Sequence, residues 1–136
     1  MRRSVFLKRV VLKNYKSIAN CSVILDRLSF LVGPNGAGKS NFIDALRFLT
    51  ESLNTTLAHA LRERGGIAEV RRRSSGHPTH FGVRLEFVLP DGYSGHYSFR
   101  IGAMPKAGFE VQREECRVYG DGLSDADEKN IHSTNP

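Results

Sequence analysis

Eight consecutive residues, from Gly33 to Ser40, constrain the fold of this chain more than any other stretch. They read Gly-Pro-Asn-Gly-Ala-Gly-Lys-Ser and match the pattern G-x-x-x-x-G-K-[ST] at every fixed position. Glycines in such a loop let the backbone adopt positive φ and turn its N–H groups inward, while the lysine and the hydroxyl that follow contact phosphate and Mg²⁺. The stretch predicts a phosphate-binding loop. The alternative is a glycine-rich turn that carries Lys-Ser by coincidence.

The residues on both sides of this loop fit the strand, loop and helix order that such a motif needs. The apolar run Leu28–Val32 enters the loop and predicts a short strand. After Lys39 the apolar residues follow helical spacing and predict a helix to about Ser52, whose N-terminus favours a bound phosphate. The apolar stripe consists of Phe42, Ala45, Leu46, Leu49 and Leu53.

Further strands and one more helix are expected around this unit. We expect strands over residues 5–12 and 21–25, because both are rich in apolar and β-branched side chains. A second helix is expected over 55–64, with a stop at Gly65-Gly66, and residues 67–78 are expected to form a loop-like connector. The phosphate loop is therefore expected to follow a sheet that has already begun.

From Thr79 the hydrophobic period changes to two, which is typical of half-buried strands. Strands are expected over 79–89 and 93–101, joined by a turn at Pro90-Asp91-Gly92. A third strand begins near Phe109, and the change of parity after Val111 predicts that it contains a bulge or ends near Arg113. This part of the sequence predicts an antiparallel meander.

Composition places the chain among ordinary domains and excludes several classes. Its 136 residues, 40% hydrophobic and 25% charged, suit one domain, and there is neither an apolar stretch long enough for a membrane span nor a signal-peptide core, so we expect a cytoplasmic protein. Cys21 and Cys116 lie far apart without a C-x-x-C pair, which argues against a disulfide framework or a zinc site.

Positive charge is unevenly distributed along the chain. The net charge is +6, and residues 1–25 hold six basic residues and no acidic one. Such a field favours polyanions, and the alternative is a solvated basic surface on part of a larger protein. A second cluster, Arg71, Arg72 and Arg73, could sense a γ-phosphate, contact DNA or bind an acidic surface; the sequence leaves these three open.

Residues 5–53 closely resemble the N-terminal lobe of ABC-type ATPases of the structural-maintenance-of-chromosomes (SMC) and RecF class, because Asn-Tyr-Lys-Ser at 14–17 and the loop with Asn41 match its motifs. Residues 79–119 match more loosely. The class includes ATPases of anti-phage systems. The resemblance implies an α/β fold, in which residues 1–120 form the N-terminal lobe of a P-loop NTPase. In this lobe a mixed sheet surrounds the phosphate-loop helix, and the antiparallel meander is added to it. Residues 121–136 hold few apolar and many polar side chains, so we expect a flexible tail or a truncation point there.

The resemblance also implies a site, cofactors and partners. In this class ATP with Mg²⁺ lies between the phosphate loop of one subunit and the signature motif of a second, so the implied partners are a second ATPase subunit, as a homodimer in the complete protein, DNA and an effector nuclease, with no membrane. By the same resemblance, Ser40 would ligate Mg²⁺. The phosphates would be held by Asn35, Gly36, Ala37, Gly38, Lys39, Ser40 and Asn41, and the base or ribose would lie near Lys13, Asn14, Lys16 and Ser17.

The chain also departs from the pattern of that class. It has no hydrophobic run that ends in Asp-Glu and no Leu-Ser-Gly-Gly signature, and Gln112 lies in a strand-like stretch where it cannot be assigned as the magnesium-sensing glutamine. Glu114 and Glu115 are candidate general bases, but neighbouring arginines favour surface ion pairs. Catalytic residues are therefore unassigned, and hydrolysis depends on motifs elsewhere in a longer chain or in a partner.

Three functions follow from these observations. The first is the ATP-binding lobe of a dimerising ATPase that acts in DNA repair or anti-phage defence, as an N-terminal portion of a longer enzyme or a piece of a split one. The second is a non-catalytic nucleotide-sensing or scaffold module that orders a partner or effector. The third, a small-molecule or nucleotide kinase, is disfavoured because the strands after the helix are antiparallel and not βαβ units.

Overall fold

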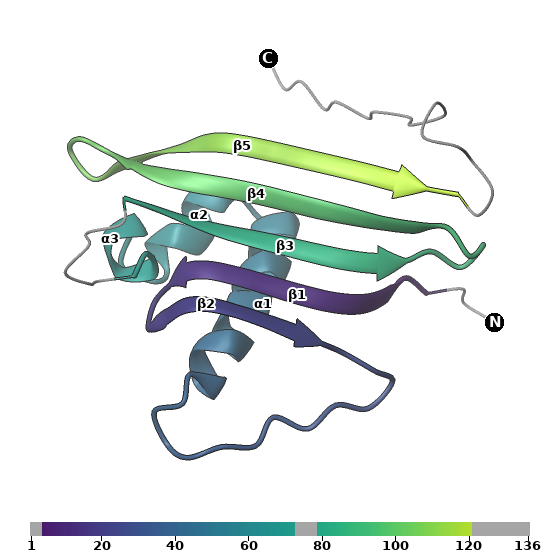
Figure 1. Cartoon of the computed structure of the whole chain (residues 1–136). Coiled ribbons are helices and arrows are strands. Elements are labelled where there is room, and N and C mark those ends of the chain that lie inside the picture. The colour runs from purple at the N-terminus through teal and green to yellow at the C-terminus, as the bar shows by residue number, and fades with distance from the viewer. Residues whose placement is uncertain (1–3, 73–78, 121–136) are drawn as a thin grey trace.

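The computed structural model describes residues 4–72 and 79–120. Within them, three helices lie on one face of a five-stranded sheet (Figure 1). The expected α/β lobe with an antiparallel meander is confirmed. In chain order the elements are β1 (Phe6–Tyr15), β2 (Ile18–Ile24), α1 (Lys39–Asn54), α2 (Leu57–Arg62), α3 (Ile67–Val70), β3 (His80–Val88), β4 (Ser94–Met104) and β5 (Gly108–Tyr119).

The strands are arranged in the order β2-β1-β3-β4-β5, and each described pair is antiparallel. After β2 the chain leaves the sheet, forms the phosphate loop and the helices, and returns as β3 on the other side of β1. The sequence predicts a mixed sheet, whereas each described pairing is antiparallel, and the further strand expected before the phosphate loop is not paired.

That segment is Leu28–Val32, which forms no strand in the structure. Its apolar side chains are largely in solvent, with Leu28 73%, Phe30 79% and Val32 90% exposed. The expectation of a strand here is wrong for the described residues. An extended segment needs a neighbour to satisfy its N–H and C=O groups, and no described strand lies beside this one.

The meander agrees closely with the sequence pattern. The turn between β3 and β4 is closed by the Leu89 N–H, which donates to the Tyr93 carbonyl at 2.7 Å, and Gly92 has a φ of 91°. The β4–β5 register shifts opposite Arg100 and Ile101, which leaves Gln112 as an extra residue in β5. The expected third strand therefore contains the bulge and continues to Tyr119 instead of ending near Arg113.

The helices after the phosphate loop differ from the expectation in two ways: α1 extends two residues beyond Ser52, and a further helix forms at the start of the expected connector. Helix α1 ends at Asn54, and α2 begins after Thr56, whose hydroxyl accepts a hydrogen bond from the His59 N–H at 3.1 Å. The expected stop at Gly65-Gly66 is confirmed by the Gly66 N–H, which donates to the Leu61 carbonyl. The expected loop over 67–78 is wrong at its start, because α3 forms there and buries its apolar side chains; residues 73–78 lie outside the described ones.

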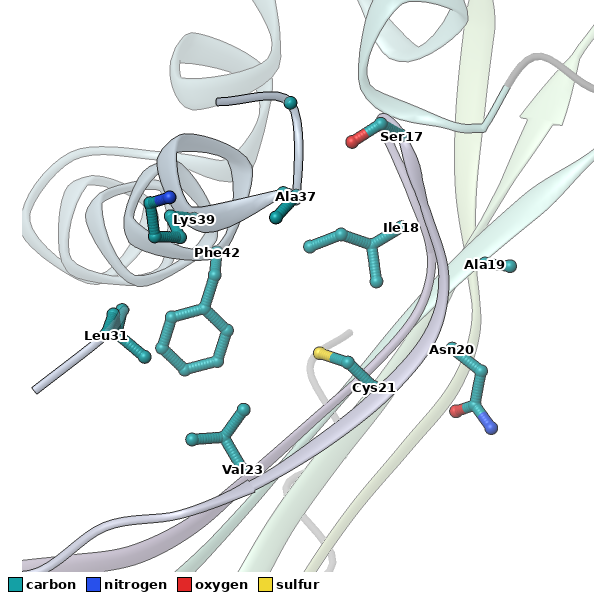
Figure 2. Close-up of a pocket in the computed structure, with 12 residues that line it drawn as sticks. Ser17, Ile18, Ala19, Asn20, Cys21, Val23, Leu31, Ala37, Lys39 and Phe42 are labelled. Carbon is teal, nitrogen blue, oxygen red and sulfur yellow. The ribbon is translucent and has the colours of Figure 1, made fainter. Parts of the chain in front are cut away.

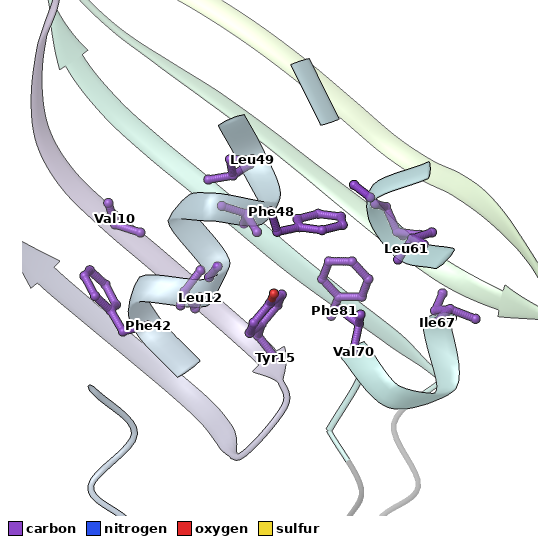
Figure 3. Packing of buried hydrophobic residues seen from close by; sticks show 14 residues of the cluster. Val10, Leu12, Tyr15, Phe42, Phe48, Leu49, Leu61, Ile67, Val70 and Phe81 are labelled. Atoms are coloured by element: carbon purple, nitrogen blue, oxygen red, sulfur yellow. The ribbon is translucent and has the colours of Figure 1, made fainter. Parts of the chain in front are cut away.

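An aromatic cluster fixes the helices on the sheet (Figure 3). The rings of Tyr15, Phe48 and Phe81 are fully buried, and their centroids lie 5.7 to 6.2 Å apart in tilted or edge-to-face arrangements. Tyr15 ends β1, Phe48 is in the middle of α1 and Phe81 is the second residue of β3, so one cluster joins three elements. Burial of such rings contributes several kcal/mol and sets the position of α1, whose first turn carries the phosphate motif.

None of the helices described for residues 4–72 and 79–120 has the length and apolar character needed to cross a bilayer.

Candidate phosphate-binding site

The Gly33–Ser40 loop runs directly into the first turn of α1. Gly36 and Gly38 have φ values of 85° and 94°, and Gly38 is the residue immediately before the helix. The Gly38 carbonyl accepts the first helical hydrogen bond from the Phe42 N–H at 2.9 Å. Both positions use the backbone freedom that the sequence motif predicted, since a side chain is strained at positive φ.

The Lys39 side chain lies across its own loop. Its Nζ donates to the Gly33 carbonyl and, at 2.9 Å, to the Pro34 carbonyl. Among the described residues no carboxylate pairs with this ammonium group, and the first turn of α1 has no acidic residue and no side-chain cap. Lys39, whose partners among the described residues are carbonyl oxygens, and the N–H groups of the helix start therefore form an electropositive site.

A cavity of about 460 Å³ adjoins this loop, which is within the usual size of small-ligand pockets. Its walls come from the β1–β2 turn, the loop and the first turn of α1. The residues that line it are Ser17, Pro34, Asn35, Gly36, Gly38, Lys39, Ser40 and Asn41. The loop is therefore neither flattened nor turned away from space large enough for a triphosphate.

The β1–β2 turn contributes one of the four residues expected near a base or ribose. Ser17 lines the cavity, and its Oγ accepts a hydrogen bond from Asn41 Nδ2 at 2.5 Å. Lys16 instead pairs with Asp44, at 2.8 Å between Nζ and Oδ2. The Asn14 carbonyl accepts from the Arg72 N–H, and Lys13 is exposed on the opposite face of the sheet. The structure does not bring Lys13, Asn14 or Lys16 to the cavity wall.

A second cavity, of about 370 Å³, lies between β2 and the loop (Figure 2). Ile18, Cys21 and Val23 line it from β2, and Leu31 and Phe42 line it from the other side. Ala37 lines this space, next to the phosphate cavity. Burial raises the pKa of the Cys21 thiol, so this thiol is less reactive than an exposed one. Sequence reasoning missed this compartment because its apolar residues have the pattern of ordinary core positions.

Asp44 connects the helix that follows the loop to the β1–β2 turn. Its Oδ2 accepts hydrogen bonds from the Tyr15 hydroxyl at 2.6 Å and from Arg64 Nε at 3.3 Å, in addition to the Lys16 ion pair. Burial by itself raises the pKa of Asp44, but the hydrogen bonds from Lys16, Tyr15 and Arg64 outweigh it and lower the pKa below its ordinary value. Burial and the Asp44 contact raise the pKa of Tyr15. No sequence pattern indicates this cluster beyond an acidic residue beside the apolar stripe of α1.

The arginine cluster at 71–73 lies beside the same turn. The backbone of Arg71 forms a bridge with Tyr15, and the Arg71 side chain lines a cavity with Lys16, Ser17, Arg64 and Glu69. Arg73 lies outside the described residues. The cavity that Arg71 lines shares Ser17 with the phosphate cavity, so the geometry brings Arg71 near that cavity.

Glu114 and Glu115 are placed on β5, at the opposite edge of the sheet from β2. Glu115 Oε1 lies 2.8 Å from His96 Nε2, and its carboxylate also pairs with Arg113 and Arg117. The His96 and Arg113 hydrogen bonds lower the pKa of Glu115 to about 2, which makes it a weak base. Glu114 accepts from the Tyr97 hydroxyl at 2.6 Å. The structural ion-pair interpretation is confirmed for Glu115. The described residues include no group of three or more metal-ligating side chains.

Comparisons with known proteins find one family model and several similar proteins. Residues 6–119 match the family model described as AAA ATPase domain. "DNA replication and repair protein RecF" of Rhizobium meliloti (strain 1021) is 33% identical over 133 residues, which cover 97% of this chain and 32% of RecF. "Chromosome partition protein Smc" of Methanocaldococcus jannaschii is 39% identical over 86 residues, which cover 62% of this chain and 6% of Smc.

A solved structure is also similar, under the description "Structural biochemistry of ATP-driven dimerization and DNA stimulated activation of SMC ATPases". It aligns with a TM-score of 0.43 and 19% identity, covering 68% of this chain and 69% of that chain. The chain spans only 32% of the length of the RecF relative from Rhizobium meliloti.

Proposed function

Because this chain belongs to the AAA ATPase domain family, we propose that it is the ATP-binding lobe of a dimerising ATPase that acts on DNA. The resemblance to the RecF and SMC class that the sequence indicated is confirmed by the family match and by the RecF and Smc relatives. Since the chain spans about a third of RecF, the activity and partners of a whole protein are part of this proposal.

The observation that carries the proposal is the phosphate loop at the start of α1, beside a cavity of about 460 Å³. In this proposal, loop N–H groups bind the phosphates, and Lys39 exchanges its carbonyl partners for phosphate oxygens, which are stronger acceptors because they are charged. The Ser40 hydroxyl, exposed at the cavity wall, suits Mg²⁺ as one oxygen ligand. Mg²⁺ when bound neutralises charge on the phosphates.

Hydrolysis requires more than these residues supply. Water must be positioned and charge neutralised in the transition state, and Glu115 is a weak base at the far edge of the sheet. The sequence has neither an apolar run ending in Asp-Glu nor a Leu-Ser-Gly-Gly segment. We therefore assign ATP binding to this chain and hydrolysis to groups that a longer chain or a second subunit provides.

Dimerisation is the proposed consequence of ATP binding. Residues 33–37 of the loop are exposed, so a bound triphosphate would present part of its surface outward. A second subunit that contacts this surface would favour the bound state of both, and ATP would then shift the equilibrium toward a dimer.

We propose two narrower settings for this activity, both in the cytoplasm. The RecF relatives are described as DNA replication and repair proteins, which favours repair. Control of an effector nuclease in anti-phage defence is the second setting and is supported only by the resemblance of the motifs.

The second candidate function is a nucleotide-sensing or scaffold module that binds ATP without turnover and orders a partner. It needs none of the catalytic motifs that the first function takes from a longer chain or a second subunit. The two functions differ in whether ATP is hydrolysed once a partner subunit is present.

Calorimetric titration of Mg·ATP into the chain tests the proposal. The parent chain is expected to bind one ATP, and Lys39→Ala is expected to weaken binding by about 10- to 100-fold, because a charged hydrogen bond contributes roughly 1.5–3 kcal/mol. Lys106→Ala, at an exposed hairpin position, is the matched control and should bind as the parent does. Equal affinity of the parent and the Lys39 variant would exclude this site.

Sedimentation with and without ATP, and phosphate release after mixing with candidate partner subunits, separate the two functions. An ATP-dependent dimer with turnover in the mixture supports the ATPase. Bound ATP that is never hydrolysed in any mixture supports the sensing module.

A further inference from the structure

The face of the sheet opposite the helices is not covered by any described element (Figure 1). Val10 and Leu12 of β1, Phe81 and Val83 of β3 and Ile101 of β4 point into the helical core, so their neighbours along each strand point to the other side. The basic residues on this outer face are Arg9, Lys13, Arg84, Arg100, Arg113 and Arg117, and the acidic ones are Glu86, Glu110 and Glu115.

One row across this face consists of cations and a glycine. Lys13 of β1 is paired with Gly82 of β3, Gly82 is paired with Arg100 of β4, and Arg100 is paired with Arg113 of β5. Adjacent strands lie about 4.8 Å apart, so the row extends over roughly 14 Å. Like charges directly opposite each other, as Arg100 and Arg113 are, destabilise a sheet, and an anion bound above them would remove that cost.

The nearby carboxylates do not neutralise this surface. Glu86 is shared by Arg9 at 3.5 Å and Arg84 at 3.2 Å. Glu115 is likewise shared by several cations. Neither Lys13 nor Arg100 pairs with a carboxylate in the part of the chain that the structure describes, and both are exposed. The row therefore keeps an excess of positive charge in solvent.

The shape of the surface suits phosphate groups. A hollow of about 380 Å³ lies over Gly82, and Lys13, Arg84, Arg100 and Arg113 are among its lining residues. Gly82 has no side chain to fill this space. The row itself holds no aromatic side chain. Phe99 also lines the hollow, but its ring packs edge-to-face on Phe81 against the helical core, so stacking of unpaired bases is not favoured.

We propose that this outer face binds the phosphate backbone of duplex DNA, with Lys13, Arg100 and Arg113 as the central contacts and Arg84 beside them. The assignment rests on the proposed function, since it names the surface on which the ATPase lobe holds DNA. Duplex DNA carries about one negative charge per 1.7 Å of its axis, so several phosphates fall within reach of the row. The site is separate from the phosphate loop, with which it shares no lining residue.

The test compares two triple variants of the 136-residue chain. Lys13→Ala, Arg100→Ala and Arg113→Ala together remove the row. Arg47→Ala, Arg62→Ala and Lys106→Ala together remove the same charge from exposed positions on helices α1 and α2 and the β4–β5 hairpin. Binding of a fluorescent duplex of about 20 base pairs is measured by anisotropy over roughly 50 to 300 mM NaCl, and Mg·ATP binding is measured by calorimetry for each protein.

The row variant is expected to lose at least about ten-fold in DNA affinity near 100 mM salt and to reduce the slope of log affinity against log salt by about two to three, at roughly 0.9 per phosphate contact. Its ATP affinity and melting temperature should not fall. The control variant should lose clearly less DNA affinity than the row variant. Arg100→Lys with Arg113→Lys keeps the charge and should retain binding, which separates lost contacts from misfolding.

Equal DNA binding by the parent and the row variant at every salt concentration would overturn the assignment of DNA binding to this face. The proposal that the chain belongs to an ATPase acting on DNA would be unaffected. A parent that binds ATP but no duplex at low salt would overturn both the surface and the DNA part of the proposed function. Displacement of the duplex by polyglutamate as effectively as by unlabelled DNA of equal charge would identify an acidic protein as the occupant and would also overturn the proposal.

Discussion

Single side chains outside the Gly33–Ser40 loop hold that loop in position. Asn41 reaches back to Ser17, and Asp44, one turn further along α1, accepts hydrogen bonds from Tyr15 and Arg64 and pairs with Lys16. The side chain of Asp44 is 24% exposed, so its contacts are partly shielded from solvent. These contacts orient the β1–β2 turn, and with it Ser17, toward the cavity.

Asp44→Asn is expected to lower the free energy of unfolding at pH 7 by about 2 kcal/mol, because it removes an ion pair and weakens two hydrogen bonds. The folded-state pKa of Asp44 is lowered, so its contribution is present above the unfolded pKa and is lost as the pH falls below about 4. Urea unfolding at pH 7, 5, 4 and 3 checks this. The difference between parent and variant should shrink toward pH 3.

Glu63→Gln, at an exposed position on the neighbouring helical segment, is the control and should leave both the stability and its pH dependence unchanged. A constant difference between the parent and the Asp44 variant across that range would contradict the role given to this carboxylate.

At the scale of elements, the start of α1 depends on its position relative to β1, β2 and the segment after α3. The Lys16 N–H donates to the Val70 carbonyl and the Arg72 N–H donates to the Asn14 carbonyl, both at 2.6 Å. These bonds join the β1–β2 turn to the chain that follows α3. The turn that contributes Ser17 to the cavity is thus supported from two sides, by α1 and by this segment.

Gly38→Ala tests the conformation at the junction of loop and helix. The φ of 94° strains any side chain there, and an added Cβ would lie 3.5 Å from Ile18 Cγ1, an ordinary contact. We expect a loss of about 1–2 kcal/mol in stability and a large loss of Mg·ATP affinity, because the loop must change its backbone to relieve the strain. Chemical unfolding and calorimetry measure the two effects.

Gly66→Ala is a matched control, since Gly66 has a φ of 93° and open space around an added Cβ, and it does not line the phosphate cavity. It should cost a similar amount of stability and leave ATP binding unchanged. If both variants bind ATP like the parent, the loop conformation is not what binds phosphate.

For the whole molecule, the two faces of the sheet are used differently. One face packs on the helices through the Tyr15, Phe48 and Phe81 cluster, and the other presents charged side chains to solvent. In the chain that follows β2, Leu28, Phe30 and Val32 add an exposed apolar segment. Such segments are typical of surfaces that contact another part of a protein or a partner.

Replacing Phe30 and Val32 together by Ser is expected to leave the melting temperature within about 2 °C of the parent, because side chains that are 79% and 90% exposed contribute little buried area. The same change should reduce the binding of a hydrophobic dye and any self-association at high concentration. Thermal unfolding and dye fluorescence measure this, with Ser29→Ala as the control. A fall of many degrees would mean that the segment is buried in solution.

Much of the fold and the central part of the site could be predicted from the sequence. The two-residue alternation after Thr79 predicted β3, β4 and their turn, because it reflects a local backbone geometry that alternates side chains between two faces. The glycines of the loop could likewise be read from the sequence, because positive φ is a local backbone property, and the structure has it at Gly36 and Gly38.

Only the tertiary structure decided which neighbours each segment has. Leu28–Val32 has the composition of a strand but lacks a described partner, and α3 forms where polar residues suggested a loop because Ile67 and Val70 reach the core. Lys13, which the family resemblance groups with the nucleotide site, lies instead on the opposite face of the sheet. Asp44 contacts the β1–β2 turn and Arg64 across separations of 20 to 29 residues in the chain. A sequence pattern fixes local conformation and the direction of a side chain relative to its neighbours in the chain, whereas pairing and packing between distant residues depend on where the whole chain places them.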